Sequence, residues 1–483
     1  MPFRRRQHFK FQRKYFHFYS LDFHFSTFHL FDCLENLSKY SIRFGMDKKL
    51  LPHQFGHIGR MLKYFKTPPA FQSRTHVYLD ASATGTGKTY TAMALCAFSG
   101  YSPIIVCPKS VIHIWQEVAA LFRIKAVIYS YEQIIGGKTG VYDKETWRFN
   151  GHQMIIFDEA HRCKNANTLH STLLMSLKGR RVKILLLSAT IADTLPAFSN
   201  FGCLLGFYGH PSRFNRWIKR CASDLKLPPM AALNRCIFPK FGSRMRSVSK
   251  ETSTVKAYCF NMNNADKIAE QYDIIEACYA YRKEQTVDAG SALARIIRAR
   301  QAIEILKVPT FLDLIRINRQ KGRSVVMFVN FNETLHLLAR ELKVTCLIHG
   351  EQTGEERINA VSAFQANREK IILCNIRAGG TGISLHDLHG DHPRVTLISP
   401  TWSAQDFIQC TGRIDRVCAK TRTAQKIIFC AGTVEKRICD TLTKKIENLS
   451  LLNDGDLDAY PMDMDPCKYE LRGDDKTIIK HRF

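Results

Sequence analysis

Short apolar runs alternate with longer amphipathic segments along most of this chain, and that alternation predicts parallel strands joined by helices. A first alternating block runs from Met46 to about Asn200, and a second begins near Arg323. We expect strands at 77–79, 104–107, 126–129, 154–157 and 184–187, and again at 325–329, 345–348, 371–374, 395–398 and 426–429. Two such blocks predict an α/β protein with two lobes, each built on a parallel sheet.

The stretches outside these blocks have a different character. Residues 201–320 are basic and mostly helical in pattern, with turn signals near Pro211 and Pro228, whereas 451–483 carries five closely spaced aspartates before a mixed charged end. We read the first stretch as an insertion with the first helices of the second lobe, and the last as a solvated tail. The expected division is an extension at 1–45, lobes at 46–225 and 321–450, a helical insertion and linker at 226–320, and a tail at 451–483.

Residues 1–45 are rich in Phe, Tyr, His, Arg and Lys and show neither a helical nor a strand period. Basic residues interleaved with aromatic ones would suit single-stranded nucleic acid, because bases stack on aromatic rings. The favoured alternatives are a poorly ordered tail and residues upstream of a start at Met46. The Arg-rich, acid-poor beginning also resembles a targeting peptide.

Charge and cysteine usage narrow the function class. The 483 residues carry a formal net charge of +27, which indicates a polyanionic partner, nucleic acid first, against the alternative of a generally basic soluble protein. The 16 cysteines form no C-x-x-C pair, and we see no clustered zinc ligands. With no secretory signal we expect a reducing intracellular compartment. No run approaches the roughly 18 apolar residues of a membrane span, so we expect no membrane partner.

A glycine-rich turn follows the first apolar run and precedes a helix-like segment, which is the setting of a phosphate-binding loop. Lys88 would reach the β- and γ-phosphates of ATP and the Thr89 hydroxyl would bind Mg²⁺. Ser82 stands where the motif has its first glycine. The alternative is a plain glycine-rich turn beside a lysine. The nucleotide-binding residues expected here are Thr84, Gly85, Thr86, Gly87, Lys88 and Thr89.

An acidic pair, Asp158 and Glu159, follows the buried-strand run 154–157. Open α/β sheets place their chemistry at such strand ends. Asp158 would hold Mg²⁺, directly or through water, and Glu159 would polarise the attacking water. A solvated strand end is the alternative, but the lysine loop about 70 residues upstream argues against it.

Further motifs occur in a fixed order in the first block. Leu51-Pro52-His53-Gln54 precedes the lysine loop, and the acidic pair continues through Ala160-His161 to Asn165. Ser188-Ala189-Thr190 follows a strand. The others are Pro103 to Ser110 followed by Trp115, and Tyr129-Ser130-Tyr131-Glu132-Gln133.

The second block carries its own set. His349-Gly350 is followed by Arg357 and Phe364, and Pro400-Thr401-Trp402-Ser403 by Gln405. The others are Ala378 to Leu385, Gln409 to Arg416, and Thr433-Val434-Glu435-Lys436. Together with the first set, this order resembles the superfamily-two helicases and translocases, and within them the Swi/Snf-like branch. One departure is Ser188-Ala189-Thr190, because Swi/Snf proteins more often carry Gly-Thr-Pro there.

The resemblance implies two RecA-like parallel-sheet lobes with an ATP cleft between them. It assigns Gln54 to the adenine edge and Gly382 to the ATP side. Arg413 and Arg416, three residues apart on one helix face, would reach across to the γ-phosphate; a solvated, salt-bridged face is the alternative. Contacts with nucleic-acid phosphates are assigned to Lys109, Ser110, Gly379, Gly380 and Thr381.

The function these motifs predict is that of an ATP-dependent DNA translocase or helicase, which hydrolyses ATP to ADP and phosphate while moving along nucleic acid. Its cofactors would be ATP and Mg²⁺, and DNA is favoured over RNA as partner. The Ser188-Ala189-Thr190 motif keeps open an RNA helicase or a transcription-linked ATPase. A non-catalytic scaffold is a third alternative, against which the intact Lys88, Glu159 and Arg413 argue. We expect the protein where the DNA is, in a nucleus or at a viral replication site.

Overall fold

The structure is a computed structural model. It describes residues 50–67, 75–137, 139–143, 145–246, 253–283, 289–380, 382–414, 419–421, 423–455, 462–472 and 477–481. Residues 52–483 form one compact unit. The predicted extension 1–45 lies outside the described residues.

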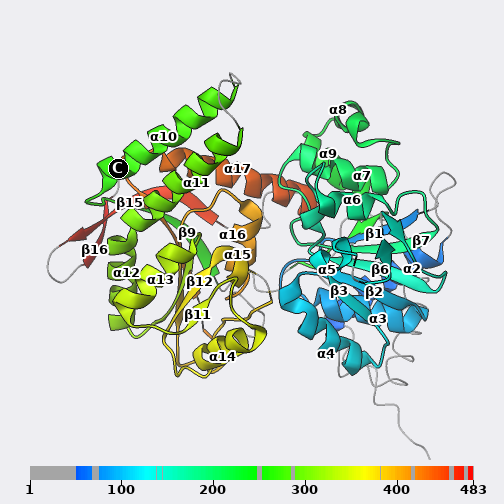
Figure 1. The fold of residues 1–483 in the computed structure, drawn as a ribbon, viewed down its shortest axis with the longest axis horizontal. Coiled ribbons are helices and arrows are strands. Elements are labelled where there is room, and N and C mark those ends of the chain that lie inside the picture. Colours follow the sequence, from blue (N-terminus) through cyan, green and yellow to red (C-terminus); the bar gives the residue numbers. More distant parts are fainter. Residues whose placement is uncertain are drawn as a thin grey trace, which may run out of the picture. The chain divides into compact units, whose positions relative to one another are not determined.

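The first lobe is built on a six-stranded parallel sheet with the strand order β3-β2-β6-β7-β1-β8 (Figure 1). All five predicted strands are present. The strands are β1 (Thr75–Asp80), β2 (Ser102–Cys107), β3 (Val127–Ser130), β6 (Gln153–Asp158), β7 (Val182–Leu187) and β8 (Gly242–Ser243), besides a small hairpin of β4 (Tyr142–Asp143) and β5 (Thr146–Trp147). The central strands β6 and β7 are apolar and buried on both faces, which explains why their sequences read as continuous apolar runs rather than alternating ones.

The helices of this lobe follow the strands in βα order, so that loops carrying the motifs gather at the carboxyl ends of the strands. The α-helices are α2 (Pro52–Lys66), α3 (Lys88–Ser99), α4 (Ile112–Phe122), α5 (Tyr131–Ile135), α6 (Leu169–Met175), α7 (Ser199–Leu204), α8 (Phe214–Leu225) and α9 (Pro229–Ile237). Short 3₁₀ turns are η1 (Lys109–Val111), η2 (Ala160–Cys163), η3 (Leu195–Phe198) and η4 (Pro211–Arg213).

The second lobe is built on an eight-stranded sheet with the order β11-β12-β10-β13-β14-β9-β15-β16 (Figure 1). Its five predicted strands are present as well. The strands are β9 (Ser253–Phe260), β10 (Ser324–Val329), β11 (Leu347–Ile348), β12 (Ile371–Asn375), β13 (Arg394–Ile398), β14 (Thr423–Cys430), β15 (Met462–Arg472) and β16 (Thr477–His481). The helices are α10 (Ala265–Lys283), α11 (Ala289–Leu306), α12 (Val308–Gln320), α13 (Asn332–Leu342), α14 (Gly354–Gln365), α15 (Ile376–Gly379), α16 (Ala404–Thr411) and α17 (Glu435–Asp454).

The predicted insertion at 226–320 is divided between the two sheets. Strand β8 pairs with β1 and completes the first sheet, whereas β9 pairs with β14 inside the second. The first lobe therefore runs beyond residue 225, and the second begins well before residue 321. Both strands were missed because β8 has only two residues and β9 lies far from its partner in sequence.

The prediction of a solvated tail at 451–483 is wrong. Helix α17 runs through to Asp454, and β15 pairs with β9 before turning back into β16. Met462 and Met464 alternate with charged residues, and so do Cys467, Tyr469 and Leu471, which is a strand period. The alternation changes phase at a register shift between Asp463 and Cys467, and together with the many aspartates this hid the strand.

Helix α17 ties the two lobes together. A buried ion pair between Lys307 and Glu435 (2.5 Å) anchors its first turn in the second lobe. At its other end Leu452 is buried in the core of the first lobe, and the Asn234 side chain donates to the Leu452 carbonyl (2.9 Å). Among the described residues, no helix is both long enough and apolar enough to cross a membrane.

Candidate ATP site and nucleic-acid cavity

The glycine-rich loop joins β1 to α3 and has the backbone that its sequence predicts. Gly85 and Gly87 have φ of 79° and 87°, in the left-handed region that favours glycine. A Cβ at Gly87 would also lie 2.3 Å from Gln54 Nε2. That Gln54 amide donates to the Thr86 carbonyl (2.9 Å), so Gln54 lies against the loop. Lys88 Nζ donates to the carbonyls of Ser82 (2.9 Å) and Ala83, which holds the lysine over the loop.

Ser82, which replaces the first glycine of the motif, makes two hydrogen bonds that hold the loop in place. Its hydroxyl accepts from the Met245 N–H (2.9 Å), and its N–H donates to Asp80 Oδ1 (3.0 Å). The loop is thereby fastened to the segment after β8. The neighbouring Arg244 guanidinium donates to the Ala81 carbonyl (2.7 Å), adding a second tie.

The acidic pair lies where β6 ends. Trp115 Nε1 donates to Asp158 Oδ2 (2.9 Å), and the Tyr131 hydroxyl donates to the Asp158 carbonyl (2.8 Å). Burial, together with the charge of Glu159, raises the pKa of Asp158 to about 6. Two adjacent carboxylates at this strand end, the first with a raised pKa, form a donor set that fits a divalent cation with oxygen ligands.

Glu159 is kept ionised by its surroundings. Burial opposes its charge, but the hydrogen bond from His161 and the positive charges of Lys88 and Arg413 outweigh burial and lower its pKa to about 2. Its Oε2 lies 3.3 Å from His161 Nδ1, which is itself 3.2 Å from Ser188 Oγ. An ionised carboxylate here can accept a proton from water.

Side chains of the second lobe reach this site directly. Gln409 Nε2 donates to Glu159 Oε2 (3.2 Å), and Gln405 Nε2 donates to the Thr190 carbonyl (2.6 Å). Lys164 Nζ donates to Gln405 Oε1 (2.6 Å) from the other direction. These contacts between the loops of the first lobe and the second lobe are hydrogen bonds between polar groups.

Gly412 shows how closely the second lobe approaches the phosphate loop. A Cβ built on Gly412 would lie 2.2 Å from Thr84 Oγ1, so any side chain at this position would collide with the loop. Thr84, predicted to bind nucleotide, is thus also a contact point for the other lobe.

Arg413 is buried at the same junction but is bound within its own lobe. Its guanidinium donates to the carbonyls of Gln409 (3.1 Å) and Gly380 (2.5 Å). Burial lowers its pKa, and the nearby charge of Glu159 opposes that shift. Its predicted contact with the γ-phosphate stays a prediction. Arg416 and Thr381 lie outside the described residues.

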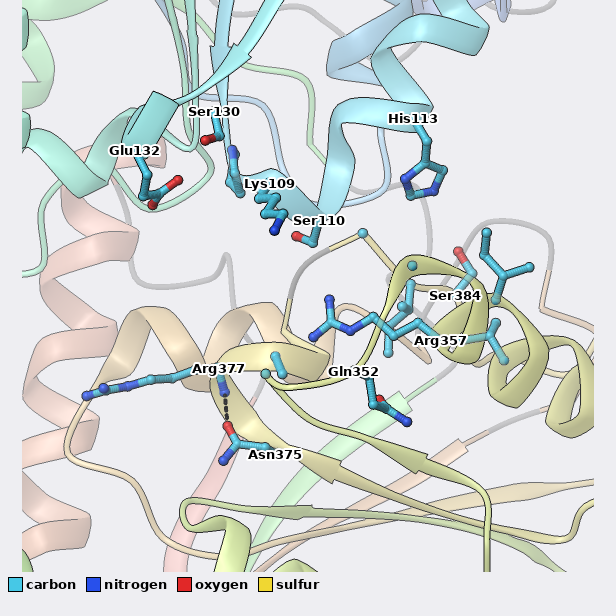
Figure 2. A pocket seen from close by; sticks show the side chains of 18 of the residues that line it. Lys109, Ser110, His113, Ser130, Glu132, Gln352, Arg357, Asn375, Arg377 and Ser384 are labelled. Carbon is cyan, nitrogen blue, oxygen red and sulfur yellow. Dashed lines mark hydrogen bonds between the residues drawn. The ribbon is translucent and has the colours of Figure 1, made fainter. Parts of the chain in front are cut away.

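A cavity of about 1170 Å³ is lined by residues of both lobes (Figure 2). Lys109 and Ser110, predicted to contact nucleic acid, line it from η1, and Figure 2 shows both pointing toward the side on which Arg357 lies. Gly382 lines the same cavity, and a Cβ there would be 2.8 Å from Val111 Cγ1. Gly382 thus lies in the same cavity as Lys109 and Ser110, and its assignment to the ATP side stays a prediction.

The two other glycines assigned to nucleic acid behave differently. Gly379 and Gly380 are buried, with Gly379 packed on Cys374 and Phe328 and with the Gly380 carbonyl receiving Arg413. Sequence reasoning assigned no role to several polar residues of the cavity, although Arg162, Arg357 and Ser384 lie within the quoted motifs. Those lining it are His113, Arg162, Gln352, Arg357, Arg377 and Ser384.

Comparisons with known proteins agree with the motifs. The family described as "Helicase conserved C-terminal domain" matches residues 306–418. A protein of Acanthamoeba polyphaga mimivirus named "Putative ATP-dependent RNA helicase" is 35% identical over 479 residues, covering 88% of this chain and 87% of that protein.

More distant relatives are chromatin-remodelling ATPases. An ISWI chromatin-remodeling complex ATPase of Arabidopsis thaliana is 22% identical over 377 residues, and the chain spans 34% of its length. A human SWI/SNF-related, matrix-associated, actin-dependent regulator of chromatin is 22% identical over 436 residues, and the chain spans 40% of it. The solved structure of Saccharomyces cerevisiae Dbp5 bound to RNA and ADP BeF3 matches with a TM-score of 0.45 at 14% identity, covering 88% of this chain and 95% of that chain.

The ordered motifs, the two parallel sheets and the extended match to the viral protein agree with one another. The protein is an enzyme that uses ATP, a nucleic-acid-dependent ATPase with two RecA-like lobes. It belongs to the superfamily-two helicases and translocases, in their Swi/Snf-like branch.

Proposed function

We propose that this protein is an ATP-driven DNA translocase that tracks the phosphate backbone. The observation that carries the proposal is the composition of the cavity wall. Of the described residues lining it, none is Phe, Tyr or Trp, whereas Lys109, Arg162 and Arg357 are cationic and several others donate hydrogen bonds. Binding single strands through their bases depends on stacking on aromatic rings, but binding phosphates needs only cations and N–H or O–H donors.

The ATP site supplies the chemistry through residues already in position. The loop N–H groups and Lys88 would bind the phosphates, with Lys88 exchanging the Ser82 and Ala83 carbonyls for phosphate oxygens. Glu159 is ionised and would take the proton of the attacking water. Arg413 would have to leave the Gly380 carbonyl in order to reach the γ-phosphate.

Thr89 and Asp158 would hold Mg²⁺, and the raised pKa of the Asp158 carboxyl, caused by burial and by the charge of Glu159, supports this assignment. A bound Mg²⁺ would neutralise charge on the phosphate oxygens. Trp115 Nε1 donates to one carboxylate oxygen of Asp158 and the Glu159 N–H to the other, which orients the carboxylate.

Coupling between hydrolysis and movement would use the polar contacts between the lobes. Gln409 bonds the catalytic Glu159, and Gln405 bonds both Lys164 and the Thr190 carbonyl. Because loss of the γ-phosphate would change the charge beside Glu159 and Arg413, these contacts would weaken and the lobes would shift. Each shift would move Arg357 of one cavity wall relative to Lys109 of the other, and so move the phosphate contacts along the nucleic acid.

The test compares ATP turnover stimulated by duplex DNA, single-stranded DNA and RNA of equal length, each over a range of salt. We expect duplex DNA to stimulate most, and the stimulation to fall with rising salt because phosphate contacts release counterions. Lys88→Ala serves as the catalytically silent control. Stimulation by RNA alone would overturn the choice of DNA in favour of the second candidate, an RNA helicase, which the name of the viral relative supports.

A further inference from the structure

The fold brings together two histidines and a glutamate, of which only His349 belongs to one of the sequence motifs. His336 lies on α13, and His349 and Glu351 lie just after β11. One ligand atom from each lies within 4.8 Å of the others. The two imidazole rings meet edge to face, with centroids 5.2 Å apart. The sequence alone showed no clustered zinc ligands, and these three side chains are grouped only in the fold.

His349 is the inner member of the cluster. Its Nδ1 is shielded from solvent and has no hydrogen-bond partner, and Glu351 Oε2 lies 4.0 Å from it. A buried polar atom without a partner is rare in native proteins and calls for an explanation. Here the ring nitrogen faces a second imidazole and a carboxylate, which are all electron-pair donors.

We propose that His336, His349 and Glu351 bind a divalent transition-metal ion of the Zn²⁺ type, with a fourth position left to water. Two imidazoles and one carboxylate form a common three-residue ligand set for Zn²⁺. Bond lengths of about 2.0–2.2 Å require the donor atoms to approach to about 3.3 Å from one another. His336 and Glu351 are exposed and can rotate inward, whereas His349 stays packed. Mg²⁺ is a poor occupant because it prefers oxygen ligands throughout.

The charges around the cluster favour a cation only in part. The Arg357 guanidinium donates to the His349 carbonyl (3.1 Å) and so places positive charge nearby. The carboxylates of Glu351 and Glu356 oppose it, although Glu356 also caps α14 through Thr353. A divalent ion held by a neutral imidazole pair and one carboxylate is compatible with this balance.

The metal would act on the nucleic-acid cavity, a consequence that rests on the proposed function. The His349 N–H donates to Gln352 Oε1 (2.9 Å), and its carbonyl accepts from Arg357. Gln352 and Arg357 both line the cavity (Figure 2). An ion bridging His336 to His349 would tie this wall to α13, and would lower the entropy lost when the wall closes on a phosphate backbone.

The first experiment measures Zn²⁺ and Co²⁺ binding to the full chain by calorimetry and by cobalt absorption. Wild type is compared with His336→Gln and Glu351→Gln, and with His152→Gln as a control for an exposed histidine of the first lobe. Because free cysteines also bind zinc, the readout is the difference between variants. We expect one metal ion per chain to bind at least about tenfold more weakly to the two cluster variants than to wild type, and to bind the control as it binds wild type. Equal binding by wild type and His336→Gln would overturn the site.

The second experiment measures affinity for duplex DNA in Zn²⁺ and in a metal chelator. Zinc should tighten binding by wild type severalfold and leave His336→Gln unchanged. If metal binds without any effect on DNA affinity, the metal site stands but its proposed effect on the nucleic-acid cavity is refuted. Failure of DNA to bind or to stimulate ATP turnover under any condition would instead count against the proposed function, so the two failures are distinguishable.

Discussion

Replacing Trp115 by Phe removes one of the two hydrogen-bond donors to the Asp158 carboxylate, the other being the Glu159 N–H. Trp115 is completely buried, and its Nε1 gives Asp158 Oδ2 a hydrogen bond of 2.9 Å. Phenylalanine keeps an aromatic ring in the core but removes the donor. A hydrogen bond to a charged group contributes about 1.5–3 kcal/mol, which corresponds to roughly 10- to 150-fold in the acid dissociation constant of that carboxyl.

The sign of the effect follows from the pKa of Asp158, which burial already raises to about 6. Losing a donor to the ionised form raises this pKa further, so a larger share of Asp158 is protonated near neutral pH. Trp115→Phe should therefore need more Mg²⁺ for half-maximal ATP turnover, and the acid limb of its pH–rate profile should move to higher pH.

The assay titrates Mg²⁺ into ATP turnover and, independently, into binding of a fluorescent ADP analogue. Trp147→Phe is the matched control, because Trp147 is also buried and its Nε1 also donates, to Ser176 Oγ (3.0 Å) and the Leu173 carbonyl. The Trp147→Phe variant should be less stable than wild type but should need the same Mg²⁺ concentration for half-maximal turnover. If Trp115→Phe folds like Trp147→Phe and needs no more Mg²⁺ than wild type, the reasoning is refuted.

Three further outcomes follow from the site. Glu159→Gln should bind ATP normally but lower turnover by roughly 10²- to 10⁴-fold, because the general base is lost; turnover at the wild-type rate contradicts its role. Gly412→Ala should slow turnover severalfold through collision with Thr84, and Thr84→Gly in the same chain should restore part of the rate; no slowing would show that the lobes do not approach there during the cycle. Asp158→Asn should be inactive, and its unfolding temperature should depend less on pH than that of wild type. A raised native pKa of Asp158 makes wild-type stability fall as pH rises from about 4 to about 6, and this contribution is lost in the variant, as thermal scans at both pH values would show.

Local signals in the sequence determined much of this protein. All ten predicted strands are present, because each is a short apolar run, and the central strands such as β6 and β7 are buried on both faces. The glycine-rich loop could also be predicted from the sequence, since Gly85 and Gly87 adopt backbone angles that favour glycine. The acidic pair could be placed at a strand end from its position after the run 154–157 alone.

Only the tertiary structure decided the features that depend on distant segments. Strands β9 and β15 became neighbours across about 200 residues, which no periodicity reveals. Gly382 turned out to pack on Val111, and His336 turned out to face His349, because both contacts join elements from separate parts of the chain. The ionisation of the acidic pair was likewise undetermined by sequence, since burial and opposing charges set a pKa, and both exist only once the chain has folded.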